Sequence, residues 1–426
     1  MIATFDFLCA FFLEYILVRN SSLSLRYSLF AGFILATSFV VALFSYRAFE
    51  EENLAEYTEQ FTRTLISLSI AVVLTALFFS IFRSKLAFRP TALTFAVLSI
   101  IIPFLNTKIY HFQLSKRKPK EFIVFVEKEK HDALRNVLHE VQERSKGRYI
   151  FKTFVDGNDN IVKLDEIIEY SSSVSFLVTN AQQHEFLRSY LYTRQLSCEV
   201  LHIADVIEDT LKRIPMQLIG MYQQYYEIKF QQIKDSPVKR VFDIFVALFG
   251  VIITSPLLLI AMLLVLIEDG RPVLFKQKRV GRYGKLFTFI KVRTLKEEKT
   301  KRKDPNENIE KRALKVGKFL RLTRLDELPQ FWLVLKGDMS IVGPRPEMVE
   351  YHEKYMKKIP FYNYRLNLKP GLTGWAQINY KHTSTLEEYI KKTEYDLYYI
   401  KNQSLLLDIQ IILQTLEAVF WRRGAR

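Results

Sequence analysis

The stretch that decides the fold of the C-terminal half is Arg321-Leu322-Thr323-Arg324-Leu325-Asp326-Glu327-Leu328-Pro329-Gln330, which an apolar run connects to Lys336-Gly337-Asp338-Met339-Ser340-Ile341-Val342-Gly343-Pro344-Arg345-Pro346. Proline is tolerated in the first turn of a helix and breaks its interior, so Pro329 predicts a helix that begins near Asp326 and ends near Gly337. The adjacent carboxylates Asp326 and Glu327 would then lie at a helix N-terminus, where they could simply cap the helix.

Cations surround these two acids in the sequence, at Arg321, Arg324, Lys336 and Arg345. A helix N-terminus bordered by cations is also a favourable place for phosphate. The stretch therefore indicates either an ordinary capped helix or a phosphoryl-transfer site.

Three further blocks accompany this stretch: Lys239-Arg240-Val241-Phe242-Asp243; Phe275-Lys276-Gln277-Lys278-Arg279-Val280-Gly281-Arg282 with Lys291-Val292-Arg293-Thr294; and Lys369-Pro370-Gly371-Leu372-Thr373-Gly374-Trp375-Ala376-Gln377. In this order the four blocks closely resemble the signature of the bacterial sugar transferases. These are monotopic phosphoglycosyl transferases, which move a phosphosugar from a nucleotide sugar to a polyprenyl phosphate. The resemblance assigns residues 236–426 to a catalytic domain, mixed but mainly α, and the earlier segments resemble the long form of the family.

Composition indicates more than one domain and an anionic partner, and charge alone does not choose which partner. A chain of 426 residues suggests two or three domains, and 49% of the residues are hydrophobic. The net charge of +16 predicts an anionic partner, namely a nucleic acid, an anionic membrane surface or a phosphorylated substrate. The two cysteines, Cys9 and Cys198, support neither a disulfide framework nor a cysteine metal site.

Four apolar stretches, near residues 3–18, 27–46, 64–82 and 91–107, predict that residues 1–110 form a four-helix transmembrane region. The first is the weakest, because Asp6 and Glu14 interrupt it. The basic run 116–120 favours a cytoplasmic position for the following segment, although charges elsewhere conflict. The resemblance implies a multi-pass protein of the bacterial inner membrane with its catalytic domain on the cytoplasmic face.

Residues 121–205 read as a small soluble α/β domain, with strands at 122–126 and 174–178 and a helix at 131–144. This position resembles a Rossmann-like nucleotide-binding domain. However, Glu127-Lys128-Glu129-Lys130 follows the first strand in place of a glycine-rich loop, so the sequence offers no backbone cradle for a pyrophosphate. We expect a spacer, regulatory or dimerisation module, followed by a linker at 206–235.

The apolar run 241–267 is long enough to cross a membrane, with Ser255 and Pro256 at its middle. The pattern alone favours a proline-kinked transmembrane helix in which Ser255 or Thr254 satisfies the freed carbonyl. The resemblance instead implies a re-entrant helix that turns at Ser255-Pro256, with Lys239 and Lys276 on the same face of the membrane.

Residues 276–303 are densely basic and interleaved with aromatics, a pattern typical of a nucleic-acid surface or, more often, of a solvated or lipid-facing one. The resemblance implies that Lys291 and Arg293 contact the diphosphate, and the alternative is that they pair structurally with acidic residues. It gives Arg345, held between two prolines, a phosphate-binding role, with Arg321 in support. Lys381 stands where many relatives have an arginine that would hold the nucleotide.

The resemblance also implies the chemistry. Asp326 would be the nucleophile that forms a phosphosugar-enzyme intermediate, and Glu327 a metal ligand or acid/base, with Mg²⁺ at the pair; which acid binds it stays open. The substrates would be a nucleoside diphosphate sugar, of the UDP type, and undecaprenyl phosphate. The expected partners are the lipid bilayer, downstream glycosyltransferases and a second copy of the chain, and not nucleic acid.

Two other functions remain open at this point. The first is a catalytically idle membrane assembly factor for polysaccharide machinery, which would not depend on Asp326. The second is a membrane-anchored nucleic-acid binder, whose binding would weaken with salt and would survive the substitution Asp326→Asn.

Overall fold

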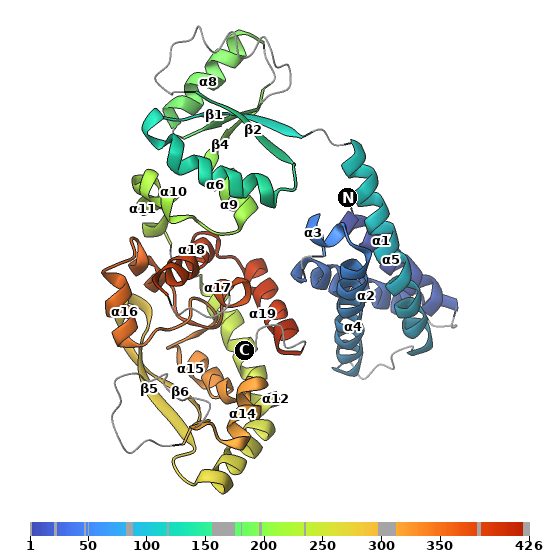
Figure 1. The fold of residues 1–426 in the computed structure, drawn as a ribbon. Helices are drawn as coiled ribbons and strands as arrows, with labels where there is room; N and C mark the ends of the chain where they lie inside the picture. The colour runs from blue at the N-terminus through green and yellow to red at the C-terminus, as the bar shows by residue number, and fades with distance from the viewer. Residues whose placement is uncertain are drawn as a thin grey trace. The chain divides into compact units, whose positions relative to one another are not determined.

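The structure, a computed structural model, describes residues 2–20, 24–46, 48–49, 51–81, 88–116, 119–155, 175–179, 181–195, 198–233, 236–296, 312–380 and 385–420. The chain divides into two units, Met1–Arg117 and Lys118–Arg426, whose elements are labelled in Figure 1.

The first unit is a helical bundle. Its helices are α1 (Ile2–Asn20), α2 (Leu25–Ser45), the short α3 (Glu51–Leu54), α4 (Tyr57–Ile81) and α5 (Phe88–Lys116). Phe39, Leu43, Leu68 and Ile102 are fully buried between them. By length and composition α2, α4 and α5 could each cross a membrane, whereas α1 does not meet the same criterion. The prediction of several apolar helices at the N-terminus is confirmed.

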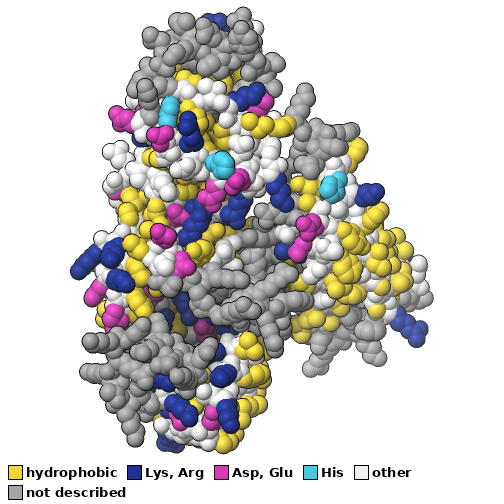
Figure 2. All heavy atoms as spheres, viewed as in Figure 1, with side chains coloured by type: hydrophobic (Ala, Val, Ile, Leu, Met, Phe, Trp, Pro, Cys, Tyr) yellow, Lys and Arg dark blue, Asp and Glu magenta, His cyan; other side chains and the backbone are white. Residues whose placement is uncertain are grey.

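The acidic residues of α1 face the interior of this bundle. Asp6 and Glu14 are fully buried. The hydroxyls of Thr91 and Thr94 on α5 each donate to the Glu14 carboxylate at 2.6 Å, and Asn106 donates to Asp6 at 2.9 Å. Hydrophobic side chains cover much of the described outer surface of this bundle (Figure 2). The two acids that weaken the first stretch as a membrane span therefore join α1 to α5, as polar groups between apolar helices often do.

The second unit begins with a four-stranded parallel sheet of order β2-β1-β3-β4. Its strands are β1 (Lys120–Phe125), β2 (Tyr149–Val155), β3 (Ser175–Val178) and β4 (Val200–His202). Phe122 and Val124 pack against α6 (His131–Arg144) and α9 (Ile203–Leu211). The alternate residues Ile123 and Phe125 pack on the other face against α8 (Ala181–Thr193). The resemblance of this domain to a Rossmann-like nucleotide-binding domain stays a prediction.

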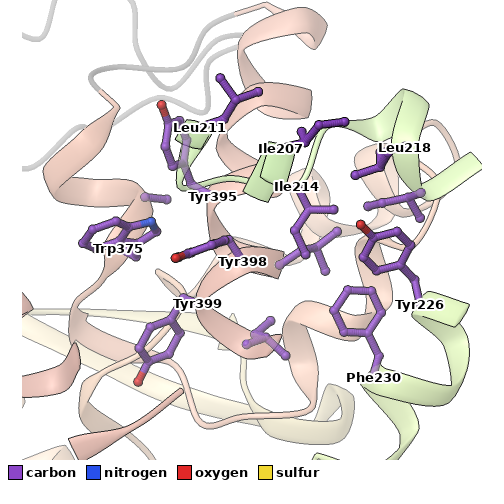
Figure 3. Packing of buried hydrophobic residues seen from close by; sticks show 14 of the residues in the cluster. Ile207, Leu211, Ile214, Leu218, Tyr226, Phe230, Trp375, Tyr395, Tyr398 and Tyr399 are labelled. Carbon is purple, nitrogen blue, oxygen red and sulfur yellow. The ribbon is translucent and has the colours of Figure 1, made fainter. Parts of the chain in front are cut away.

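The chain after this sheet is packed into the catalytic part. Helices α10 (Met216–Met221) and α11 (Gln223–Gln231) contribute Leu218, Tyr226 and Phe230 to a core shared with α17 (Trp375–Asn379) and α18 (Leu386–Asn402). Figure 3 shows Ile214 between Tyr398 on one side and Tyr226 and Phe230 on the other, within this one core. Trp375 is buried in the same core, and its indole nitrogen donates to the Lys212 carbonyl at 2.9 Å. Trp375 therefore supports the joint between the two parts.

The catalytic part packs against one side of the long helix α12 (Pro237–Asp269), whose other side is exposed. Its other elements follow in chain order: β5 (Leu274–Val280), β6 (Leu286–Val292), α14 (Lys315–Leu322), η3 (Leu325–Glu327), α15 (Gln330–Lys336), β7 (Ser340–Val342), α16 (Val349–Met356), η4 (Tyr362–Leu366), β8 (Gly371–Thr373), α17, α18 and α19 (Leu405–Phe420). Strands β5 and β6 form an antiparallel hairpin, and β7 pairs with β8 in parallel.

Both ends of α12 are tied to this fold. At its start, Lys239 pairs with Asp408 of α19 at 2.7 Å, and Arg240 donates to the carbonyls of Val334 and Leu335 at the end of α15. At its end, the Glu268 carboxylate accepts from the backbone nitrogens of Lys315 and Val316. Lys239 and Arg240, which begin the block Lys239–Asp243, therefore have a structural role: they hold the start of α12 against α19 and α15.

The middle of α12 is uninterrupted in the structure. Pro256 leaves the carbonyl of Ile252 without its helical donor, and the Ser255 hydroxyl donates to that carbonyl at 3.1 Å, as predicted. Figure 2 shows hydrophobic side chains along the edge where α12 lies in Figure 1. The turn of a re-entrant helix stays a prediction.

The predicted helix at Asp326 begins later than expected. Arg324 has a left-handed backbone (φ 58°), Leu325–Glu327 form a single 3-10 turn, and the α-helix starts only at Gln330 with Pro329 as its N-cap. The left-handed residue reverses the chain after α14, so the two acids occupy the turn between two helices. Gly337 ends α15 with φ 96°, as predicted.

Candidate active site

Asp326 lies in the 3-10 turn η3, which contacts β6, α14 and α12. Only 5% of the residue is exposed. Burial raises the pKa of its carboxyl to about 6, and the charge of Glu327 adds to this, although Lys291, Arg321 and Arg324 oppose it. A buried carboxylate with few solvating partners is a stronger nucleophile than one in water, so this environment suits attack on phosphorus.

Glu327 has a different environment from its neighbour. Its Oε1 accepts from Nη2 of Arg345 at 3.3 Å and lies 3.5 Å from Nη1 of Arg324. Burial alone would raise the pKa of Glu327, but Arg345, Arg324 and Lys291 lower it below its ordinary value. Two adjacent acids whose pKa values move in opposite directions are suited to different roles.

Lys291 and Arg321 provide positive charge beside Asp326. Lys291 is on β6, where its ammonium lies 5.4 Å from the centre of the Phe275 ring, and burial lowers its pKa while Asp326 raises it. Arg321, at the end of α14, donates through Nε to Thr294 at 2.8 Å. Gly317 lets α14 approach the backbone of Thr294 closely, since a Cβ added at Gly317 would lie 2.3 Å from the Thr294 carbonyl oxygen.

Arg293 does not join this cluster. Its guanidinium lies 3.1 Å from the Asp269 carboxylate and donates to the carbonyls of Asp269 and Gly270, so it caps the C-terminus of α12. Because β6 ends at Val292, Arg293 no longer shares the strand face of Lys291. The structure places Arg293 at the end of α12, apart from Lys291, and its contact with the diphosphate stays a prediction. Lys381 lies outside the described residues.

Sequence reasoning missed a second charged group behind Arg345. Glu347 pairs with Lys392 of α18, and Arg365 of η4 pairs with Asp396 of the same helix at 2.7 Å. Arg279 on β5 stacks on Phe289 at 4.3 Å and donates to the Pro346 carbonyl at 2.7 Å. The Pro-Arg-Pro-Glu spacing was the signal available for Glu347. The partners on α18 are too distant in sequence to be read from any motif.

The described residues contain no group of three or more His, Cys, Asp or Glu side chains that could hold a metal ion by themselves. Mg²⁺ is commonly held by one or two carboxylates together with substrate phosphates and water. The pair Asp326 and Glu327 fits that requirement, since both are oxygen donors in one turn. The donor set is thus compatible with a magnesium ion that arrives with a phosphorylated substrate.

Comparison with known proteins points to the same family as the four sequence blocks. Residues 234–422 match the family model described as "Bacterial sugar transferase". The chain is 35% identical over 232 residues to UDP-N-acetylgalactosamine-undecaprenyl-phosphate N-acetylgalactosaminephosphotransferase of Aeromonas hydrophila, covering 53% of each chain. It is 36% identical over 282 residues to UDP-glucose:undecaprenyl-phosphate glucose-1-phosphate transferase of Klebsiella pneumoniae, covering 60% of this chain and 59% of that protein. The matches thus span little more than half the length of these two relatives.

A shorter relative is covered almost completely. The uncharacterized sugar transferase EpsL of Bacillus subtilis is 40% identical over 190 residues, which is 44% of this chain and 89% of that protein. The four sequence blocks, the family model and this coverage lead to one conclusion: the chain belongs to the bacterial sugar transferase family.

Proposed function

We propose that the chain transfers a phosphosugar from a nucleoside diphosphate sugar, of the UDP type, to undecaprenyl phosphate. The products are a polyprenyl diphosphate sugar and a nucleoside monophosphate, which would begin the synthesis of a surface polysaccharide or glycoconjugate. The observation that carries the proposal is the buried carboxylate of Asp326 with Lys291 and Arg321 beside it. The names of the relatives point to the same class of reaction, with different sugars.

Asp326 supplies the nucleophile in this proposal. A carboxylate oxygen attacks the sugar-bearing phosphorus and forms a new P–O bond. The phosphoanhydride bond breaks, and its electron pair leaves with the nucleoside monophosphate. A phosphate oxygen of the polyprenyl phosphate then attacks the same phosphorus and releases the Asp326 carboxylate.

The cations have separate tasks. Lys291 and Arg321 neutralise the non-bridging oxygens as the phosphorus is attacked. Arg345 binds phosphate with a planar fork and keeps Glu327 ionised. Asp326 and Glu327 would hold Mg²⁺, which would stabilise negative charge on the leaving phosphate.

We also propose that α12 enters and leaves the membrane on one side, which we take to be the cytoplasmic face of the bacterial inner membrane. Support comes from its two ends, because Lys239 and Glu268 both bind parts of one folded domain. A helix that crossed the bilayer would place these partners on opposite sides. Labelling of Val238→Cys and Lys276→Cys, in a chain with Cys9 and Cys198 replaced by serine, tests this in sealed vesicles. Modification of the two positions from opposite sides would refute it.

The reaction is tested by nucleoside monophosphate release from the detergent-solubilised protein with undecaprenyl phosphate, Mg²⁺ and a panel of UDP-sugars. We expect release with one sugar, its loss in Asp326→Asn, and normal release in Glu353→Gln, which removes an exposed carboxylate of α16. Trapping of the radiolabelled phosphosugar on the wild-type protein, but not on Asp326→Asn, tests the covalent step. Full activity of Asp326→Asn would contradict the role of Asp326 as nucleophile, whereas no release with any UDP-sugar would favour the catalytically idle assembly factor.

A further inference from the structure

The segment that carries Arg345 is fixed by an unbroken series of backbone contacts. The carbonyl of Pro344 accepts from the backbone nitrogen of Gly371 at 3.0 Å, and that of Arg345 accepts from Nη2 of Arg365 at 3.3 Å. The carbonyl of Pro346 accepts from Nη1 of Arg279 at 2.7 Å, and that of Glu347 accepts from the backbone nitrogen of Val280 at 3.1 Å. Four consecutive carbonyls therefore have donors, in a segment where two prolines already restrict the backbone.

Two of these donors are arginine side chains that need a counter-charge. Arg365 is 4% exposed and binds Asp396, but its Nη2 also lies 3.8 Å from Oε1 of Glu347. Arg279 is close enough for its charge to act on both Arg345 and Glu347. Without a negative group at this place, Arg279, Arg345, Arg365 and Lys392 would repel one another.

Glu347 supplies that negative group. Its carboxylate pairs with Lys392 on α18, and the residue is only 9% exposed. Burial alone would raise the pKa of Glu347, but Lys392, Arg365 and Arg279 lower it to about 2. It is therefore ionised at every pH at which the enzyme would work.

We propose that Glu347 is a positioning residue of the transfer reaction: it holds Arg365 on the carbonyl of Arg345 and Arg279 on that of Pro346, so that the Arg345 guanidinium stays directed at Glu327 and the diphosphate. This inference rests on the proposed function. Glu347 acts through Arg345 and does not itself touch the substrate.

A double-mutant cycle tests this role. Glu347→Gln should lower kcat/KM for nucleoside monophosphate release by about tenfold to a hundredfold, the loss expected when a reacting group is displaced by about 1 Å. Arg345→Lys should lower it further, because lysine lacks the planar fork. The double variant should then be no worse than Arg345→Lys alone, since Glu347 has no effect once Arg345 is gone. Losses that multiply, or an unimpaired Glu347→Gln, would overturn the proposal.

Separate variants test whether a loss of activity comes from a folding defect. Glu347→Gln leaves Lys392 buried without its partner, so the paired variant Glu347→Gln/Lys392→Met is measured alongside it and should keep the wild-type thermal unfolding temperature. It should show the same loss of kcat/KM and the same lack of additivity with Arg345→Lys; normal activity would overturn the proposal. Glu347→Asp, which keeps the charge, should recover part of the activity, and Glu350→Gln on exposed α16 should behave as wild type.

The result is distinguishable from a failure of the proposed function. Dependence of release on Asp326 is established first, on the same preparations. If Asp326→Asn is inactive and the cycle is additive, the reaction stands and the positioning role falls. If the wild-type protein releases no nucleoside monophosphate from any UDP-sugar, the proposed function itself falls, and if Asp326→Asn is fully active, the assignment of Asp326 as nucleophile falls.

Discussion

Nη2 of Arg345 lies 3.3 Å from Oε1 of Glu327, and this contact separates the two adjacent acids of the site. Glu327 is held ionised by the arginine, whereas the pKa of its neighbour Asp326 is raised to about 6 by burial and by the charge of Glu327. One acid is therefore a fixed charge, and the other is a reactive group whose protonation changes near neutral pH.

The first prediction concerns the pH dependence of the covalent step. Because Asp326 must be ionised to attack, the rate of nucleoside monophosphate release at limiting donor should rise with pH and level off above about 6. The measurement is made without polyprenyl phosphate, whose own second ionisation would overlap. Glu353→Gln should give the same profile. A flat rate between pH 5 and 7 would contradict the assignment.

The second prediction concerns stability. The pKa of Asp326 is about 6 when folded and 3.8 in its ordinary state, so the folded chain holds this proton more tightly. Stability should therefore fall as pH rises from about 4 to 6, by 1–3 kcal/mol as an order of magnitude, and stay lower above that range. Asp326→Asn should consequently raise the thermal unfolding temperature at pH 8 but not at pH 4. If Asp326→Asn unfolds at pH 8 at the same temperature as wild type, or at a lower one, then the ionised carboxylate of Asp326 does not destabilise the folded protein.

The third prediction concerns the joint between the α/β domain and the catalytic part. Arg213 is buried and pairs with both Glu140 of α6 and Glu394 of α18. Arg213→Ala would leave Glu394 buried without its cation, and breaking such a pair costs about 3–5 kcal/mol. Urea or thermal unfolding should show this loss, while Arg188→Ala, on the exposed side of α8, should not. An unchanged transition would mean that the two parts are not held together by this pair.

Sequence reasoning located the reactive turn but not its supports. Asp326, Glu327 and Arg345 lie within one continuous motif, so local spacing was sufficient to group them. Lys291 and Arg293 looked equivalent because they are two residues apart, yet the strand ends between them and Arg293 binds the end of α12. The different positions of these two residues follow from where β6 ends, and residue types alone do not determine that point.

The same limit applies to polar residues in helices. Asp6 and Glu14 reduced the apolar character of the first helix, and only the neighbouring helix α5 explains them. Strands β1 and β3 and helix α6 were found close to their predicted positions, because the hydrophobic period is a local signal.

The last prediction connects α12 to the reactive turn. Gly250 of α12 faces Phe331, four residues after Glu327, and an added Cβ would lie 2.7 Å from the Phe331 ring. Gly250→Val should therefore push α15 away from α12, destabilise the protein by about 1–3 kcal/mol and reduce nucleoside monophosphate release.

The compensating change identifies the cause. Gly250→Ala should show a smaller form of the same defect, and Gly250→Ala/Phe331→Leu should recover both stability and activity, because the shorter side chain makes room for the methyl group. Ile253→Ala, on an exposed position of α12, serves as the control for general changes in this helix. If Gly250→Val retains full activity and stability, the contact with Phe331 does not position the turn. If the double variant fails to recover, the defect arises elsewhere on α12 than at the ring.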